Sequence, residues 1–90
     1  MYDIEFTKTA LAGIIKLQKS EPICYKKLYK LIEELKIHPK TGTGQPEQLK
    51  GFHIPIWSRR ISKKHRLVYE IYEIKIRVVI LSSYGHYDEK

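Results

Sequence analysis

The chain has 90 residues, enough for one compact domain, and we interpret residues 1–90 as a single domain. It carries 17 Lys and Arg against 10 Asp and Glu, so its net charge of +7 favours polyanionic partners. The single cysteine, Cys24, excludes an intramolecular disulfide and a cysteine-based zinc site, and the apolar runs are too short for a membrane span. The composition therefore indicates a basic protein of the reducing cytoplasm.

The start of the chain predicts a strand and a short helix. Residues 2–6 alternate apolar and acidic side chains with the period of a half-exposed strand. Thr7 follows, with a hydroxyl that can accept from an unpaired N–H at a helix start, and the helix is expected to end near Ser20. The residues at helical spacing, which we expect to pack on a sheet, are Leu11, Ile14, Ile15 and Gln18.

A second helix is predicted from Pro22 onward. A proline in the first turn removes no helical hydrogen bond, and the helix is expected to end before Pro39. The apolar stripe of this helix, expected to pack into the core, consists of Cys24, Leu28, Leu31, Ile32 and Leu35.

The C-terminal half predicts a loop and an antiparallel meander. Residues 40–47, "KTGTGQPE", combine two glycines with a proline and form the clearest loop of the chain. The following "LKGFHIPI" is irregular or a short edge strand, because Pro55 cannot donate to a sheet. Strand-like segments then cover residues 57–61, 65–73 and 74–87. The fold class is therefore α+β, with two helices on one face of an antiparallel sheet in the order β-α-α-β-β-β.

Strand alternation predicts two arginines on one open face of that sheet. In each of the two strands within "WSRRISKKHRLVY", residues 57–69, the more apolar phase is expected to face the helices, which leaves Arg60 and Arg66 on the other side. A turn over residues 62–64 would place these two arginines opposite or diagonal to each other. The phase expected to face the helices comprises Trp57, Ile61, Leu67, Tyr69 and Ile71.

The other basic residues of this stretch have different expected places. Arg59 shares the side of Trp57 and is expected at the periphery, whereas His65 falls on the core side and is interpreted as structural. Lys63 and Lys64 lie in the predicted turn, where their positive charge is expected to bind nucleic acid.

Two facing arginines repel each other unless an anion lies between them. Like charges across a sheet cost a few tenths to about 1 kcal/mol, and a phosphate would suit the paired N–H donors of Arg60 and Arg66. The alternative is that both long side chains turn into water. Geometry alone leaves both interpretations open.

Metal-independent cleavage of an RNA phosphodiester needs a base, an acid and cations around the phosphate. Glu47 is the candidate base and His86 the candidate acid, because histidine exchanges protons near neutral pH, while Tyr87 could stack or donate a hydrogen bond. Each has an alternative: Glu47 could pair with Lys50, His86 could be an exposed terminal residue, and Tyr87 could pack on the sheet. No histidine spacing suits a metal site, so no metal or other cofactor is expected.

The segments "GTGQPEQLKG", "WSRRI", "HRLVY" and the late "HY" resemble, in this order and spacing, the YoeB/Txe branch of the RelE-like bacterial toxins. That resemblance covers nearly the whole chain and is strongest from Gly42 to Tyr69. It implies a RelE-like fold and a ribosome-dependent mRNA endonuclease that cuts in the A site. By motif, it implies catalytic roles for Glu47, Arg66, His86 and Tyr87, and RNA contacts for Lys50 and Arg60.

The resemblance also implies partners. These are the mRNA and the ribosome, and a YefM-like antitoxin whose C-terminal segment covers or distorts the site. Homodimers occur in this branch of toxins, so the resemblance implies that this chain can also form a homodimer. A protein of a different class, a non-catalytic inhibitor that binds ribosomal RNA through Lys and Arg, would need the charge but not Glu47.

Overall fold

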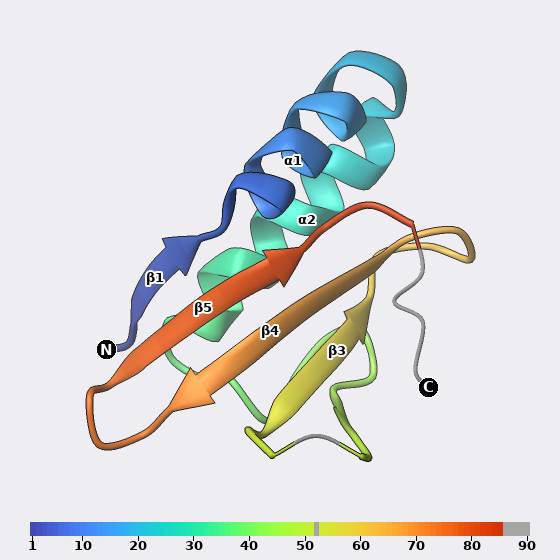
Figure 1. Cartoon of the computed structure of the whole chain (residues 1–90). Coiled ribbons are helices and arrows are strands. Elements are labelled where there is room, and N and C mark those ends of the chain that lie inside the picture. Colours follow the sequence, from blue (N-terminus) through green and yellow to red (C-terminus); the bar gives the residue numbers. More distant parts are fainter. Residues whose placement is uncertain (52, 86–90) are drawn as a thin grey trace.

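The computed structural model describes residues 1–51 and 53–85, in which two helices pack on one face of a five-stranded sheet (Figure 1). The sheet order is β1-β5-β4-β3-β2, with β1 parallel to β5 and the other neighbouring pairs antiparallel. The elements, in chain order, are β1 (Asp3–Phe6), α1 (Lys8–Ser20), α2 (Pro22–Leu35), β2 (Glu47–Leu49), β3 (Ile56–Arg60), β4 (Arg66–Tyr72) and β5 (Arg77–Ser82).

This architecture confirms the α+β class and corrects two details of the prediction. The sheet is not wholly antiparallel. After β1, the two helices lead the chain over one face of the sheet to its opposite edge, and the strands from β2 to β5 then return as a meander. The last strand, β5, pairs in parallel with β1. The loop after α2 is followed by a fifth strand, β2, which pairs with β3 at the opposite edge. β2 ends before Pro55, so the proline lies outside the ladder, in agreement with its missing N–H.

Helix α1 begins and ends as predicted but turns a different face to the sheet. The Thr7 hydroxyl accepts from the N–H of Ala10 at 3.1 Å, which caps the helix. Of the four residues expected to pack on the sheet, Ile14 is partly buried against the core, whereas the prediction is wrong for the other three. Gln18 is exposed, and Leu11 and Ile15 are 48% and 51% exposed. The buried positions are instead Ala10, Gly13 and Leu17.

Helix α2 buries the predicted stripe. Leu28, Leu31 and Leu35 are buried, with Cys24 and Ile32 partly buried against the same core. The sheet contributes the predicted helix-facing phase to this core, so the assignment of faces is confirmed for Trp57, Ile61, Leu67, Tyr69 and Ile71. Within the described ranges, no helix is both long and apolar enough to cross a membrane.

The hairpin of β3 and β4 has the predicted register. Arg60 is the direct partner of Arg66, and the turn over residues 62–64 is closed by a hydrogen bond from the Ile61 N–H to the His65 carbonyl at 3.0 Å. This register fixes which side chains emerge together on the face that the helices leave open.

Candidate active site

Three strand ends bring Glu47, Arg60 and Arg66 onto the open face of the sheet. Glu47 begins β2 and pairs with Ser58, while Arg60 ends β3 and pairs with Arg66 at the start of β4. Paired residues on neighbouring strands point to the same face, and so do residues two apart in one strand. Glu47 therefore lies diagonal to Arg60, which itself faces Arg66.

The charges of this face have no protein partner in the described part of the chain. No carboxylate among the described residues forms an ion pair with Arg60 or Arg66, although the two arginines are direct cross-strand neighbours. Arg60 is exposed, Arg66 is half-buried and Glu47 is exposed. The alternative pair between Glu47 and Lys50 is not formed within the described residues. The face thus presents two adjacent guanidinium groups and a carboxylate to the solvent.

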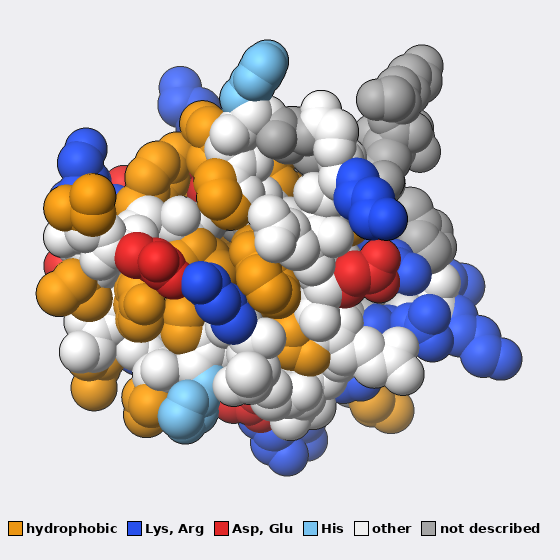
Figure 2. Space-filling model, turned by 90° about the horizontal axis from the view of Figure 1, so that it is seen from below, with side chains coloured by type: hydrophobic (Ala, Val, Ile, Leu, Met, Phe, Trp, Pro, Cys, Tyr) orange, Lys and Arg blue, Asp and Glu red, His pale blue; other side chains and the backbone are white. Residues whose placement is uncertain are grey.

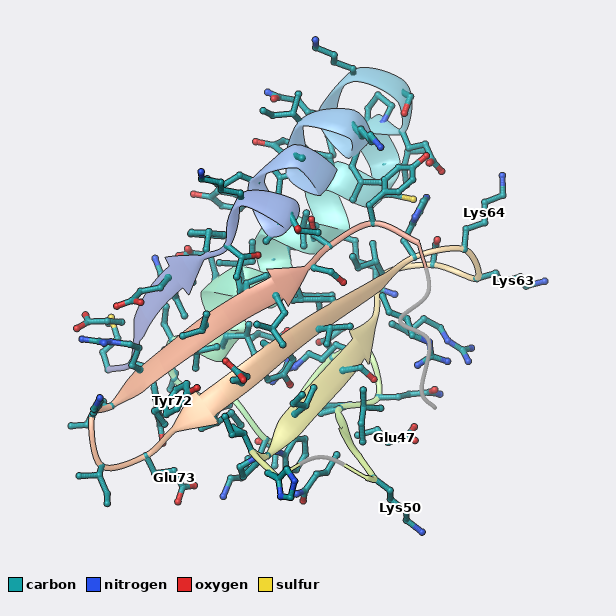
Figure 3. All side chains as sticks on the ribbon, in the orientation of Figure 1. Glu47, Lys50, Lys63, Lys64, Tyr72 and Glu73 are labelled. Carbon is teal, nitrogen blue, oxygen red and sulfur yellow. The ribbon has the colours of Figure 1, made fainter. Side chains whose placement is uncertain are left out.

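Further lysines border this face. Glu47 and Lys50 lie at the β2 edge, whereas Lys63 and Lys64 project from the turn between β3 and β4 (Figure 3). All three lysines are exposed. Seen from below, Lys and Arg side chains gather on the side of the molecule where this turn lies (Figure 2). The lysines of the turn therefore lie beside the arginine pair, whereas Lys50 lies toward the other end of β3, because β2 runs antiparallel to β3.

The candidate acid His86 and its neighbour Tyr87 lie outside the described residues. The last described residue is Gly85, which is fixed beside the arginine pair. The Arg66 N–H donates to the Gly85 carbonyl at 3.0 Å, and the Gly85 N–H donates to Nδ1 of His65 at 2.8 Å. His65 is buried, as the structural interpretation of this residue expected.

Arg59 is the residue whose place the sequence prediction missed. It is not peripheral: its side chain is completely buried between the sheet, α2 and the loop that leads to β2. Nη1 donates to Glu34 Oε1 at 2.8 Å and to the Thr43 carbonyl, and Nη2 donates to the Thr41 carbonyl at 2.8 Å and to the His38 carbonyl. Nε donates to the Tyr69 hydroxyl at 3.1 Å.

All five N–H donors of the Arg59 guanidinium are therefore used inside the protein. Hydrogen bonds from Thr43, together with Arg59, lower the pKa of the Glu34 carboxyl, so Glu34 stays charged as a counter-ion. Burial raises the pKa of Tyr69, whose hydroxyl keeps its proton and donates to the Pro39 carbonyl at 2.8 Å. Arg59 thus fastens the loop before Glu47 to the sheet and has no donor left for a ligand.

Strand alternation alone could have placed Arg59 on the core side, because it shares the phase of Trp57. A charged residue in that phase needs a buried acceptor set, and the carbonyls of a Gly/Pro-rich loop are such a set. The sequence does not show that the loop folds back over β3.

An apolar hollow of about 540 Å³ lies at the other end of β4 and does not suit a phosphate. Its lining includes Trp57, Ile71 and Tyr72, and the ion pair of Lys40 and Glu73 belongs to its rim. Figure 2 shows apolar side chains with acidic and basic ones beside them on this underside. Since Arg60 and Arg66 are not among its lining residues, the candidate active site is the open face and not this hollow.

Comparison with known proteins identifies relatives over nearly the whole chain. The family model of the YoeB-like toxin of bacterial type II toxin-antitoxin systems matches residues 6–87. Toxin YoeB of Synechocystis sp. is 34% identical over 84 residues, which cover 93% of this chain and 95% of that protein. A YoeB/ParE toxin from Agrobacterium tumefaciens superposes with a TM-score of 0.86 at 30% identity, covering 94% of this chain and 99% of that one.

YoeB of Staphylococcus aureus has been solved as a dimer and in a YoeB-YefM complex, and both structures are 30% identical to this chain. Their TM-scores are 0.82 and 0.80, with 96% and 97% of this chain and 98% and 99% of theirs covered. The resemblance seen in the sequence motifs is thereby confirmed, and so is the fold that it implied. The chain belongs to the family of YoeB-like toxins of bacterial type II toxin-antitoxin systems.

Proposed function

We propose that the protein is a metal-independent endoribonuclease that cuts mRNA in the ribosomal A site and thereby stops translation. The observation that carries this proposal is the direct pairing of Arg60 with Arg66 on the open face, diagonal to Glu47 and without a carboxylate partner in the described residues. Two adjacent guanidinium groups repel each other until an anion binds between them, and a phosphodiester fits their paired donors.

In the proposed reaction, the 2′-oxygen of one nucleotide attacks the neighbouring phosphorus. Glu47 takes the 2′-OH proton, the P–O5′ bond breaks, and His86 gives its proton to the leaving 5′ oxygen. The products are a 2′,3′-cyclic phosphate and a free 5′-OH, so atoms and protons balance without a metal. Arg66 and Arg60 stabilise the charge that develops on the phosphate oxygens. Tyr87 is assigned to stacking on, or hydrogen bonding with, the RNA.

The lysines around the site bind the wider nucleic acid in this scheme. Lys50 lies close behind Glu47 in the chain and supports the phosphate of the mRNA, while Lys63 and Lys64 contact ribosomal RNA from the exposed turn. Exposed lysines suit this role because they act as mobile point charges.

The proposed partner in the resting cell is a YefM-like antitoxin. The likeness to the Staphylococcus aureus YoeB that was solved with YefM supports this assignment, and the dimer of the same relative supports self-association as a second state. An antitoxin that neutralises the charge of the open face would prevent RNA binding there.

Our first prediction concerns the three reacting groups. Glu47→Gln, Arg66→Ala and His86→Gln should each lower the rate of mRNA cleavage on translating ribosomes by roughly 10²- to 10⁴-fold and abolish growth arrest. The measurement is cleavage of a defined mRNA on purified ribosomes, with circular dichroism to verify the fold. Glu33→Gln is the matched control, because Glu33 is an exposed carboxylate on α2 that pairs only with Lys36 among the described residues.

Full toxicity and unchanged cleavage in all three variants would contradict the assignment. Primer extension on mRNA from expressing cells separates the nuclease from a non-catalytic inhibitor that binds ribosomal RNA. A nuclease leaves new 5′ ends at codon-defined positions, and Glu47→Gln removes them. An inhibitor that only binds leaves none, and it tolerates the loss of Glu47.

A further inference from the structure

His65 connects two segments that are far apart in the sequence. Its side chain is 3% exposed and lies just before β4. Nε2 is 2.7 Å from Oε2 of Glu21, the residue between α1 and α2, and Nδ1 accepts from the N–H of Gly85 at 2.8 Å. The imidazole thus bridges the helical layer and the segment that follows β5.

The chemistry of the two partners fixes the tautomer of the ring. A backbone N–H can only donate, so Nδ1 of His65 must carry a lone pair, and the ring proton must lie on Nε2. That proton is donated to the Glu21 side chain, because an ionised carboxylate has acceptors but no donor. The neutral Nε2–H form is therefore the one that satisfies both neighbours at once.

Gly85 is held on both of its polar atoms. Its N–H is bound by His65, and its carbonyl accepts from the Arg66 N–H at 3.0 Å. Its φ of 75° lies in the left-handed region, which glycine adopts without steric cost, so the chain turns at this residue. These contacts fix the position and the direction of the backbone directly beside Arg66.

The residue before Gly85 reinforces this arrangement. The ring of Tyr84 packs on His65 with 4.5 Å between ring centroids and a tilt of 45°. The ammonium group of Lys16, on α1, lies 5.1 Å from the centre of the Tyr84 ring. The Glu21 side chain and the segment that follows β5 thus contact the His65 imidazole directly, and α1 supports this arrangement through the contact of Lys16 with Tyr84.

We propose that His65 is a positioning residue for cleavage. By accepting the hydrogen bond from the Gly85 N–H, it fixes the position of the backbone that directly precedes His86. This inference rests on the proposed function, in which His86 is the acid. His65 itself does not contact RNA, because both of its ring nitrogens are occupied and its side chain is buried.

Two substitutions separate the two contacts of the ring. In His65→Asn, the side-chain oxygen replaces Nδ1 and can still accept from Gly85, whereas the donor to Glu21 is lost. In His65→Gln, the longer amide replaces Nε2 and can still donate to Glu21, whereas the acceptor for Gly85 is lost. A positioning role predicts that the Asn variant keeps its cleavage rate and that the Gln variant does not.

The test measures cleavage on ribosomes together with amide hydrogen exchange of Gly85. For His65→Gln we expect loss of Gly85 protection and a kcat lower by about 10- to 100-fold at an unchanged KM, the scale that small misplacement of a reacting group causes. For His65→Asn we expect Gly85 to stay protected and kcat to stay within about threefold of the wild type. Thermal unfolding shows whether both variants fold.

Equal cleavage rates in the two variants at equal stability would overturn the inference, and so would a protected Gly85 amide in the Gln variant. Glu47→Gln, measured in parallel, distinguishes a wrong positioning role of His65 from a wrong proposed function. If Glu47→Gln is inactive and His65→Gln is fully active, only the positioning role is wrong. If Glu47→Gln cleaves as fast as the wild type, the proposed function is wrong, and the exchange of Gly85 still decides whether His65 fastens it.

Discussion

Arg59 and Arg60 are neighbours in the sequence and have opposite environments. Because successive side chains of a strand point to opposite faces, Arg59 enters the core and Arg60 emerges on the open face. Burial of the Arg59 charge is tolerated because Glu34 and three loop carbonyls surround it. One arginine thus holds the loop that leads to Glu47, and the other remains free for a ligand within the described structure.

The buried hydroxyl of Tyr69 leads to a specific prediction about the stability of the protein. It accepts from Arg59 and donates to the Pro39 carbonyl, and Tyr69 is completely buried. Tyr69→Phe removes one hydrogen bond from the buried Arg59 Nε–H and one from the Pro39 carbonyl. The free energy of unfolding should therefore fall by about 1 to 3 kcal/mol. Urea unfolding measures this change.

Tyr72→Phe is the control for that experiment. The Tyr72 hydroxyl bonds to Glu70 of the same strand and lies near the surface, so its loss should change stability by less than about 0.5 kcal/mol. Equal losses in the two variants would show that the buried hydroxyl of Tyr69 adds no more stability than a hydroxyl near the surface.

Helix α1 shows how close packing overrides a hydrophobic pattern. Its larger apolar side chains, Leu11 and Ile15, are exposed, while Ala10 and Gly13 face the end of β5. A Cβ on Gly13 would lie 2.9 Å from the Tyr84 Cβ and 2.6 Å from the Ser83 hydroxyl oxygen. The small residues allow the helix to approach the segment that carries Gly85.

Gly13→Ala tests this contact. Alanine gains roughly 1 kcal/mol of helix propensity over glycine, whereas overpacking at a close contact costs about 1 to 3 kcal/mol, so we expect a net loss of stability near 1 kcal/mol. Thermal unfolding measures it. Ala12→Gly, at the exposed neighbouring position, reports the propensity term alone. A Gly13→Ala variant more stable than the wild type would contradict the proposed close approach.

The whole molecule combines a net charge of +7 with an uneven distribution of that charge. The exposed lysines of the turn between β3 and β4 lie beside the arginine pair, and the hairpin register places both on one side of the molecule. Electrostatic attraction to RNA releases counter-ions, so affinity falls with salt in proportion to the number of phosphate contacts.

Replacing Lys63 and Lys64 together by Ala should therefore flatten the salt dependence of ribosome binding. Two lost phosphate contacts lower the slope of log affinity against log salt by about 1 to 2. Filter binding at several salt concentrations measures it. The matched control, Lys26→Ala with Lys30→Ala on the exposed side of α2, should leave the slope unchanged. Equal slopes in both double variants would show that the turn does not contact RNA.

The sequence by itself determined the α+β class, the bounds of both helices within a few residues, and the faces of β3 and β4. These follow from local signals, namely the Thr7 cap, the apolar stripe of α2 and the alternation of strand residues, each of which acts within a few positions. The motif resemblance also determined the family.

Only the tertiary structure decided the parallel pairing of β1 with β5, the inward face of α1, the burial of Arg59, and the bridge from Glu21 through His65 to Gly85. Each depends on segments that are distant in the chain. Which loop carbonyls reach a guanidinium, or which amide reaches an imidazole, is set by packing of the whole domain, because a local pattern specifies a face but not its partner.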